Sequence, residues 1–175
     1  MIAYRRAYEP GGCYFFTVVT YERRPLLIDH ILNLRSAFSH ALEQRPAQMD
    51  ALVILPDHLH TLWRLPPGDS DVSGRWTHIK RLFSAQLMHV ATTTPSQAEG
   101  DSGVWQRGFG ERLVESEQEW RRYMDYIHYN PVRHGLCQRP IEWPYGTFRS
   151  AVAEGLYNRD WGRELPDSIA GLDLE

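Results

Sequence analysis

The chain has 175 residues, of which 42% are hydrophobic and 23% charged, and its formal net charge is −3. This composition is ordinary for one globular domain with a single core. No apolar run approaches the roughly 18 residues of a membrane-spanning helix. The two cysteines, Cys13 and Cys137, exclude a cysteine-rich zinc site or a disulfide framework. We therefore expect a soluble cytoplasmic protein.

The charged residues are unevenly distributed. Residues 151–175 hold six acidic and two basic side chains, and the rest of the chain is nearly neutral. Lys80 is the one lysine among 19 basic residues. The other basic residues are arginines, whose planar guanidinium suits phosphates and guanine edges, although a GC-rich genome gives the same bias. We expect a functional domain over residues 1–150, with an acidic segment over 151–175 that packs on it or trails from it.

The first half of the chain alternates strand and helix patterns. Aromatic and β-branched runs predict strands, and apolar residues at helical spacing predict helices. The predicted strands are 13–20, 49–55 and 58–65, the last two forming a hairpin around Pro56-Asp57. The predicted helices are 29–42, with Asp29 as a candidate cap, and 72–90.

The second half begins with a predicted surface loop over residues 91–103. An interrupted strand pattern over 104–114 follows, broken around Gly108 and Gly110. Ser116 and Glu119 form a capping-box pattern, so a helix is predicted to start there and to stop before Pro131. The order β–α–β–β–α–β predicts an α+β fold: a ferredoxin-like antiparallel sheet with helices on one face and an extra C-terminal helix.

Two histidines stand two residues apart on a predicted strand. His58 and His60 would point to the same face, with Leu59 on the opposite face. Two imidazoles on one side can hold one divalent cation. The His-x-His pattern also arises by chance in many proteins, so it indicates a metal site only weakly.

A tyrosine and an asparagine are four residues apart on the predicted third helix. Tyr126 and Asn130 would therefore share a face, where a phenol could attack phosphorus while an amide oxygen binds a metal. Tyr126 could equally belong to an apolar stripe, and Asn130 could be a helix stop before proline. Tyr129 is the rival nucleophile, but its offset from Asn130 favours Tyr126.

Taken together, these motifs resemble those of the REP-associated tyrosine transposases (REP, repetitive extragenic palindrome), a family of the HUH superfamily that acts on single-stranded DNA. The resemblance covers roughly residues 4–165. One departure is Gly110, where we expect an aromatic residue. The matching segments are Leu55-Pro56-Asp57-His58-Leu59-His60, Val104-Trp105-Gln106-Arg107-Gly108-Phe109, Tyr126-Ile127-His128-Tyr129-Asn130-Pro131-Val132-Arg133-His134-Gly135 and Trp143-Pro144-Tyr145-Gly146-Thr147-Phe148.

The resemblance implies a metal-dependent endonuclease and strand transferase. Tyr126 would form a 5′-phosphotyrosine, and His58, His60 and Asn130 would hold Mg²⁺ or Mn²⁺. The implied partners are single-stranded REP hairpins with a guide tetranucleotide, which places the protein at the bacterial nucleoid. A monomer is favoured and a dimer stays open. The candidate DNA-binding residues are Tyr4, Arg5, Arg6, Lys80, Arg81, Gln106 and Arg107.

Two other functions remain open at this point. The chain could bind hairpin DNA or repress transcription without cutting. It could also be a small zinc protein that uses His58, His60 and either His128 or His134. In addition, each candidate DNA-binding residue could be no more than a solvated surface charge.

Overall fold

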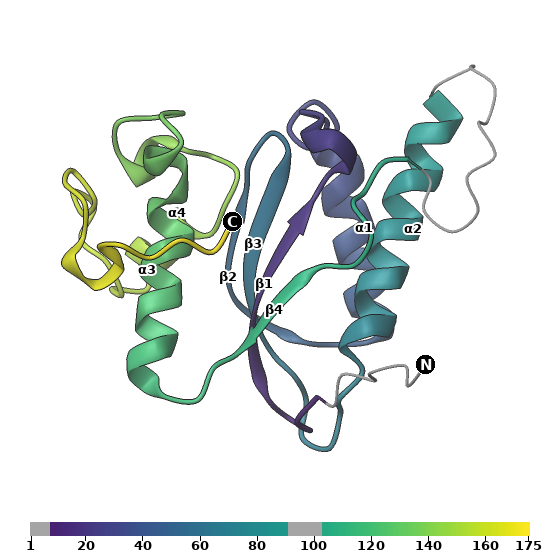
Figure 1. Ribbon diagram of the computed structural model, residues 1–175, viewed down its shortest axis with the longest axis horizontal. Helices are drawn as coiled ribbons and strands as arrows, with labels where there is room; N and C mark the ends of the chain where they lie inside the picture. The colour runs from purple at the N-terminus through teal and green to yellow at the C-terminus, as the bar shows by residue number, and fades with distance from the viewer. Residues whose placement is uncertain (1–7, 91–102) are drawn as a thin grey trace.

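The computed structural model describes residues 8–90 and 103–175 (Figure 1). One antiparallel sheet of four strands, in the order β2-β3-β1-β4, forms its centre. The strands and longer helices are β1 (Cys13–Val19), α1 (Ile31–Gln44), β2 (Gln48–Ile54), β3 (His58–Arg64), α2 (Val72–Val90), β4 (Gly110–Leu113), α3 (Glu117–Arg133) and α4 (Phe148–Ala153).

The predicted element order and fold class are confirmed. β1 pairs with both β3 and β4, so it is a central strand, and β2 and β3 form the predicted hairpin. Helices α1 and α2 cover one face of the sheet, and α3, the extra helix, covers the other face (Figure 1). None of the described helices is long and apolar enough to span a membrane.

The face toward α1 and α2 is filled with large apolar side chains. Phe16 of β1 and Trp63 of β3 are fully buried there, together with Trp76 of α2. The rings of Trp63 and Trp76 stack with their centroids 4.5 Å apart, and the ring of Phe16 meets both edge-on. Offset and edge-to-face contacts of this kind are the favourable arrangements for aromatic pairs. This layer therefore provides much of the apolar core.

The face toward α3 takes the alternate residues of the same strands. Phe15 and Leu62 lie there with Met124 and Ile127 of α3. His58 and His60 fall on this face because they have the same parity as Leu62 on β3. Leu59 lies in the opposite core, as the alternation predicts. The strand register places Thr17 of β1 directly opposite His60.

Three local predictions were wrong or only partly right. Helix α3 does not stop before Pro131 but runs to Arg133, because the following amides still find helix carbonyls, as in the 3.0 Å bond from His134 N to Asn130 O. Helix α1 begins at Ile31 with His30 in the capping position, so Asp29 is not the cap. Ser116 caps α3 by accepting from Glu119 N, but the Glu119 carboxylate accepts from Glu115 N.

The fourth strand is shorter than its predicted range. Trp105 makes only an isolated bridge to Thr20, and the continuous strand starts at Gly110. Gly108 interrupts the pairing with a φ of +74°, a conformation that glycine adopts without strain. The predicted surface loop lies outside the described residues as far as residue 102.

Candidate functional site

The two histidines of β3 lie side by side beneath α3. His58 and His60 are 1% and 0% exposed, and their ring centroids are 5.1 Å apart. The ring of Phe15 stacks on His60 at 5.4 Å and fixes its plane. The strand pleat thus brings both imidazoles to one point, as the His-x-His pattern predicts.

Each imidazole is oriented by a hydrogen bond on its Nδ1 atom. His58 Nδ1 lies 2.6 Å from a carboxylate oxygen of Asp57, and His60 Nδ1 lies 2.9 Å from Thr17 Oγ1. Because the Thr17 hydroxyl donates to the carbonyl oxygen of Leu174, it accepts from His60. Both histidines therefore carry a proton on Nδ1 and direct Nε2 into the site, as metal-binding histidines do.

Helix α3 supplies a tyrosine and an asparagine to the same point. The ring of Tyr126 is 5.3 Å from that of His60, and the residue is 1% exposed. Asn130, one turn further along α3, is completely buried. Its Oδ1 atom has no hydrogen-bond partner among the described residues. An unpaired buried acceptor is costly, so this oxygen is available for a ligand.

A carboxylate from the far end of the sequence occupies the point where these side chains meet. Glu175 Oε1 lies 3.1 Å from Tyr126 Oη and 3.4 Å from His60 Nε2. The same oxygen lies 3.1 Å from Nε2 of His134, the residue that follows α3. Its partner Oε2 lies 3.0 Å from His58 Nε2. Glu175 therefore fills the site between β3 and α3.

The segment that carries Glu175, residues 170–175, is held along α3. The Leu174 amide donates to Tyr126 Oη at 3.1 Å. Arg133 donates to the Leu172 carbonyl at 2.6 Å and pairs with Asp173 at 3.2 Å. Figure 1 shows the C-terminus returning to the sheet beside α3. In this arrangement the C-terminal segment covers the hydroxyl of Tyr126.

Burial and ion contacts set the charges in the site. Burial opposes ionisation of Glu175, but its contacts with His58 and His60 dominate and hold the pKa of the carboxyl far below its usual range. Burial likewise opposes charge on His58, yet Glu175 and Asp57 raise its pKa, whereas burial lowers the pKa of His60 to about 4. Burial raises the pKa of Tyr126 to about 12, and Glu175 adds to the rise. With Glu175 in place, Tyr126 is thus a neutral phenol.

The structure brings together the four residues predicted for the metal and the nucleophile. The rival Tyr129 lies elsewhere, with its ring centroid 6.4 Å from that of Trp161. His128 is buried beside Thr147 and Phe148. Of the two histidines proposed as a third zinc ligand, only His134 reaches the cluster, with its ring centroid 5.0 Å from that of His58.

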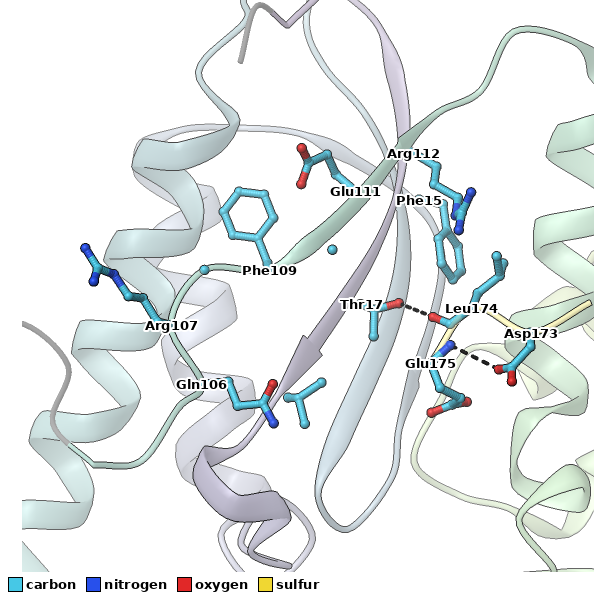
Figure 2. Close-up of a pocket in the computed structure, with 13 residues that line it drawn as sticks. Phe15, Thr17, Gln106, Arg107, Phe109, Glu111, Arg112, Asp173, Leu174 and Glu175 are labelled. Carbon is cyan, nitrogen blue, oxygen red and sulfur yellow. Dashed lines mark hydrogen bonds between the residues drawn. The ribbon is translucent and has the colours of Figure 1, made fainter. Parts of the chain in front are cut away.

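The candidate DNA-binding residues fall into three groups. Gln106 and Arg107 are exposed and line a pocket of about 580 Å³ that ends at Glu175, and they point in different directions (Figure 2). Arg81 is exposed on α2. Lys80 is buried, and its ammonium donates to the carbonyls of Gln106 and Gly108. Lys80 thus supports the loop that presents Gln106 and Arg107. Tyr4, Arg5 and Arg6 lie outside the described residues.

The sequence analysis missed three residues of the site. Asp57 and Thr17 orient the histidines, and Glu175 completes the cluster, whereas His134 was named there as a possible zinc ligand. Asp57 stands inside a quoted motif, where an acid next to His58 could have indicated it. Thr17 is recognisable only once β1 is placed opposite β3. Glu175 carries no local signal, because its position depends on the whole course of the C-terminal segment.

A buried tyrosine beside a His-x-His pair on a central strand of a ferredoxin-like sheet defines the class of HUH tyrosine enzymes. No family model matches the chain. A REP-associated tyrosine transposase of Escherichia coli K12 is 39% identical over 172 residues, which cover 98% of this chain and 97% of the relative. A Haemophilus influenzae relative, given the same family name provisionally, is 38% identical over 98% of this chain and 99% of its own length.

A solved structure agrees with these relatives. The REP-associated tyrosine transposase bound to a REP hairpin superposes with a TM-score of 0.81 at 37% identity, covering 95% of this chain and 94% of that one. The chain belongs to the REP-associated tyrosine transposases. It is therefore a tyrosine transposase and a DNA-binding protein, and the site described above is the candidate centre of its activity.

Proposed function

We propose that the chain cleaves and rejoins single-stranded DNA beside REP hairpins, with Tyr126 as the nucleophile. The observation that carries this proposal is the convergence of Tyr126, His58, His60 and Asn130 on one point, now taken by the Glu175 carboxylate. A carboxylate there stands where a phosphate would have to lie for the phenol to reach phosphorus. The similar structure is described as bound to a REP hairpin, and the same kind of DNA is the proposed partner here.

The chemistry assigned to Tyr126 is a transfer of the phosphodiester bond. The phenolic oxygen attacks the scissile phosphorus, the bond from phosphorus to the 3′ oxygen breaks, and a 5′-phosphotyrosine remains. The phenol gives up one proton, and the departing 3′ oxygen takes one up. A 3′-hydroxyl of another strand can reverse the reaction and join that strand without ATP, because the phosphotyrosine retains the energy of the original bond.

The donors around Tyr126 fit Mg²⁺ or Mn²⁺. His58 and His60 present Nε2, and the unpaired Oδ1 of Asn130 is the third donor. A mixed nitrogen and oxygen set with open positions suits these cations. When bound, such a cation neutralises charge on the phosphate. The protein's own contribution is to hold both imidazoles through Asp57 and Thr17.

DNA contacts are proposed on the rim next to this point. Gln106 and Arg107 on the loop before β4 would meet the strand that leads to the cleavage position (Figure 2). The exposed Arg81 of α2 would contact phosphates. Tyr4, Arg5 and Arg6 are proposed to read exposed bases, including a guide tetranucleotide. We propose that the protein acts as a monomer.

Cleavage requires that Glu175 leave the site. In the arrangement seen here Tyr126 is covered, neutral and hydrogen-bonded to Glu175, so the protein could bind a hairpin on its rim without cutting it. Non-cleaving hairpin binding is therefore the second candidate function, and it describes this closed arrangement. The two functions differ only in whether the C-terminal segment is displaced.

The direct test is a search for a covalent complex. The full chain and a chain ending at Asp173 are incubated with a single-stranded REP hairpin and Mn²⁺, Mg²⁺ or a chelator, and adducts are separated under denaturing conditions. We expect a protein–DNA adduct on the peptide that contains Tyr126, more of it in the shortened chain, and none with chelator. If neither chain forms an adduct with either cation, non-cleaving binding is the correct function.

A further inference from the structure

The contacts of Glu175 include a set of groups that differs from the proposed catalytic donors. A ring nitrogen of His58, a ring nitrogen of His134 and a carboxylate oxygen of Glu175 all lie within 4.8 Å of one another. Two imidazoles and a carboxylate are a common protein donor set for Zn²⁺. This set shares only His58 with the donors proposed for Mg²⁺ or Mn²⁺, and it exists only while residues 170–175 lie in the site.

The spacing of these atoms is that of ligands around one ion. With metal bonds of about 2.1 Å, neighbouring ligand atoms lie about 3.0 Å apart in octahedral and about 3.4 Å apart in tetrahedral geometry. The observed distances are 3.0 Å from Glu175 Oε2 to His58 Nε2 and 3.1 Å from Glu175 Oε1 to His134 Nε2. Each imidazole thus lies at ligand spacing from the carboxylate, which would contact the cation through one or both oxygens.

Hydrogen bonding alone accounts poorly for the contact between His58 and Glu175. Although the two atoms are 3.0 Å apart, Nε2 of His58 has no hydrogen-bond partner of acceptable direction among the described residues. An oxygen that shares a metal with a ring nitrogen lies off the axis of that nitrogen's lone pair. The off-axis contact between His58 Nε2 and Glu175 therefore fits a shared cation as well as a direct ion pair.

We propose that His58, His134 and Glu175 bind Zn²⁺, and that this ion fastens the C-terminal segment in the site. By linkage, the segment strengthens zinc binding by the same factor by which zinc strengthens the docking of the segment. Imidazole donors favour Zn²⁺ over Mg²⁺, which prefers oxygen donors and water. The consequence for activity, that zinc holds the enzyme closed, rests on the proposed function.

The test needs no DNA and therefore does not depend on cleavage. Zn²⁺ affinity is measured by competition with a chromophoric chelator, and amide hydrogen exchange of the peptide covering residues 170–175 is followed by mass spectrometry. For the full chain we expect one zinc ion and exchange of the Leu174 amide slowed by about tenfold or more. Mg²⁺ at the same concentration should have no such effect.

Three variants make the test specific. Glu175→Gln and His134→Ala should each weaken zinc binding by about tenfold or more and abolish the zinc-dependent slowing. Glu164→Gln removes an exposed carboxylate of the same region and should behave as the parent does. Circular dichroism checks that each variant is folded, which we expect because Glu175 and His134 lie at the surface end of the site.

Two results would overturn the inference. Equal zinc affinity in the parent and Glu175→Gln would mean that any bound ion uses other donors. Faster or unchanged exchange of the Leu174 amide in zinc would mean that the ion displaces the segment or ignores it. Failure of the proposed function looks different: no covalent adduct forms with any DNA, while zinc still slows exchange.

Discussion

The two faces of the sheet bury different kinds of side chain. The face under α1 and α2 encloses Phe16, Trp63 and Trp76, which contact one another as rings. The face under α3 encloses His58, His60, Tyr126 and Asn130, whose polar atoms meet at Glu175. Three indole N–H groups on the first face, those of Trp63, Trp76 and Trp105, also have no hydrogen-bond partner among the described residues, but each is one edge of an otherwise packed ring.

On the first face, a buried charged group is paired with nearby residues. The buried guanidinium of Arg75 donates to the carbonyls of Arg45, Pro46 and Asp71 and pairs with Asp69. On the second face Asn130 Oδ1 finds no hydrogen-bond partner within the described part of the chain. The Nε2 atoms of the two histidines contact Glu175, which is more than a hundred positions away in sequence. One face is thus arranged for stability and the other for a ligand, and the predictions below test that division.

The largest effect is expected from the nucleophile. Tyr126→Phe removes only the attacking oxygen, so covalent adduct formation should be abolished while hairpin affinity changes by less than about 1 kcal/mol. Tyr129→Phe is the matched control and should still form the adduct, because Tyr129 lies against Trp161 rather than in the cluster. Denaturing gels and binding titrations measure both properties. An active Tyr126→Phe would refute the assignment.

The next effect should separate stability from activity. Trp76→Ala opens a cavity in the apolar face and should lower the free energy of unfolding by about 3–5 kcal/mol. His60→Phe keeps a ring of similar volume on the other face, so it should change that free energy by less than about 1.5 kcal/mol. His60→Phe should nevertheless lose most cleavage. Denaturant unfolding measures the stability of both variants, and the adduct assay measures their cleavage. Equal destabilisation by both variants would contradict the assignment of one face to stability and the other to a ligand.

A smaller effect is expected at the rim. Arg107→Ala should weaken hairpin binding by about 1–3 kcal/mol without changing the melting temperature, since the side chain is exposed. Lys80→Met should instead lower the melting temperature, because its ammonium holds the loop carbonyls of Gln106 and Gly108. Titrations at two salt concentrations and thermal melts distinguish the two roles. The reverse pattern would make Lys80 the DNA contact.

The smallest effect concerns the matched charge on the first face. Arg75 lowers the pKa of Asp69 from 3.8 to about 2, so the folded state favours the ionised carboxyl. The stabilisation is fully present above pH 3.8 and is lost as the pH falls toward about 2. Asp69→Asn should lower the free energy of unfolding by less than about 1 kcal/mol near neutrality, because Asp69 is partly exposed. In acid the loss should be smaller still, because the carboxyl of the parent is then protonated as well. Thermal melts of the parent and the variant across this pH range test the prediction. A difference in melting temperature that does not change with pH would exclude the ion pair as its cause.

Much of this architecture follows from local sequence patterns. The alternation of β3 predicts that His58 and His60 share one face with Leu59 on the other, and the spacing of Tyr126 and Asn130 predicts their shared face. The prediction that the third helix stops before Pro131 was wrong, because proline removes only one backbone donor and the residues around it still form helix. The predicted Asp29 cap was wrong because the helix starts at Ile31, so His30 takes the capping position.

The remaining part of the site depends on contacts between distant segments. Asp125 accepts hydrogen bonds from Tyr157 and Ser168, both at 2.7 Å, and so anchors the chain that leads to Glu175. Neither the acidic composition of residues 151–175 nor any short motif indicates that course. A carboxylate in the site is therefore a property of the folded chain that no local pattern could predict.

In the proposed mechanism the Glu175 carboxylate competes with the DNA strand for the place beside Tyr126, at a local concentration set by the tether rather than by the solution. Such a competitor divides the apparent affinity of that place for all strands by one common factor, the inverse of the fraction of molecules in which the place is free. The ratio between a matching and a mismatched hairpin stays the same. The C-terminal segment thus sets how much DNA is needed before the tyrosine is reached, and it leaves the choice among sequences to the residues on the rim.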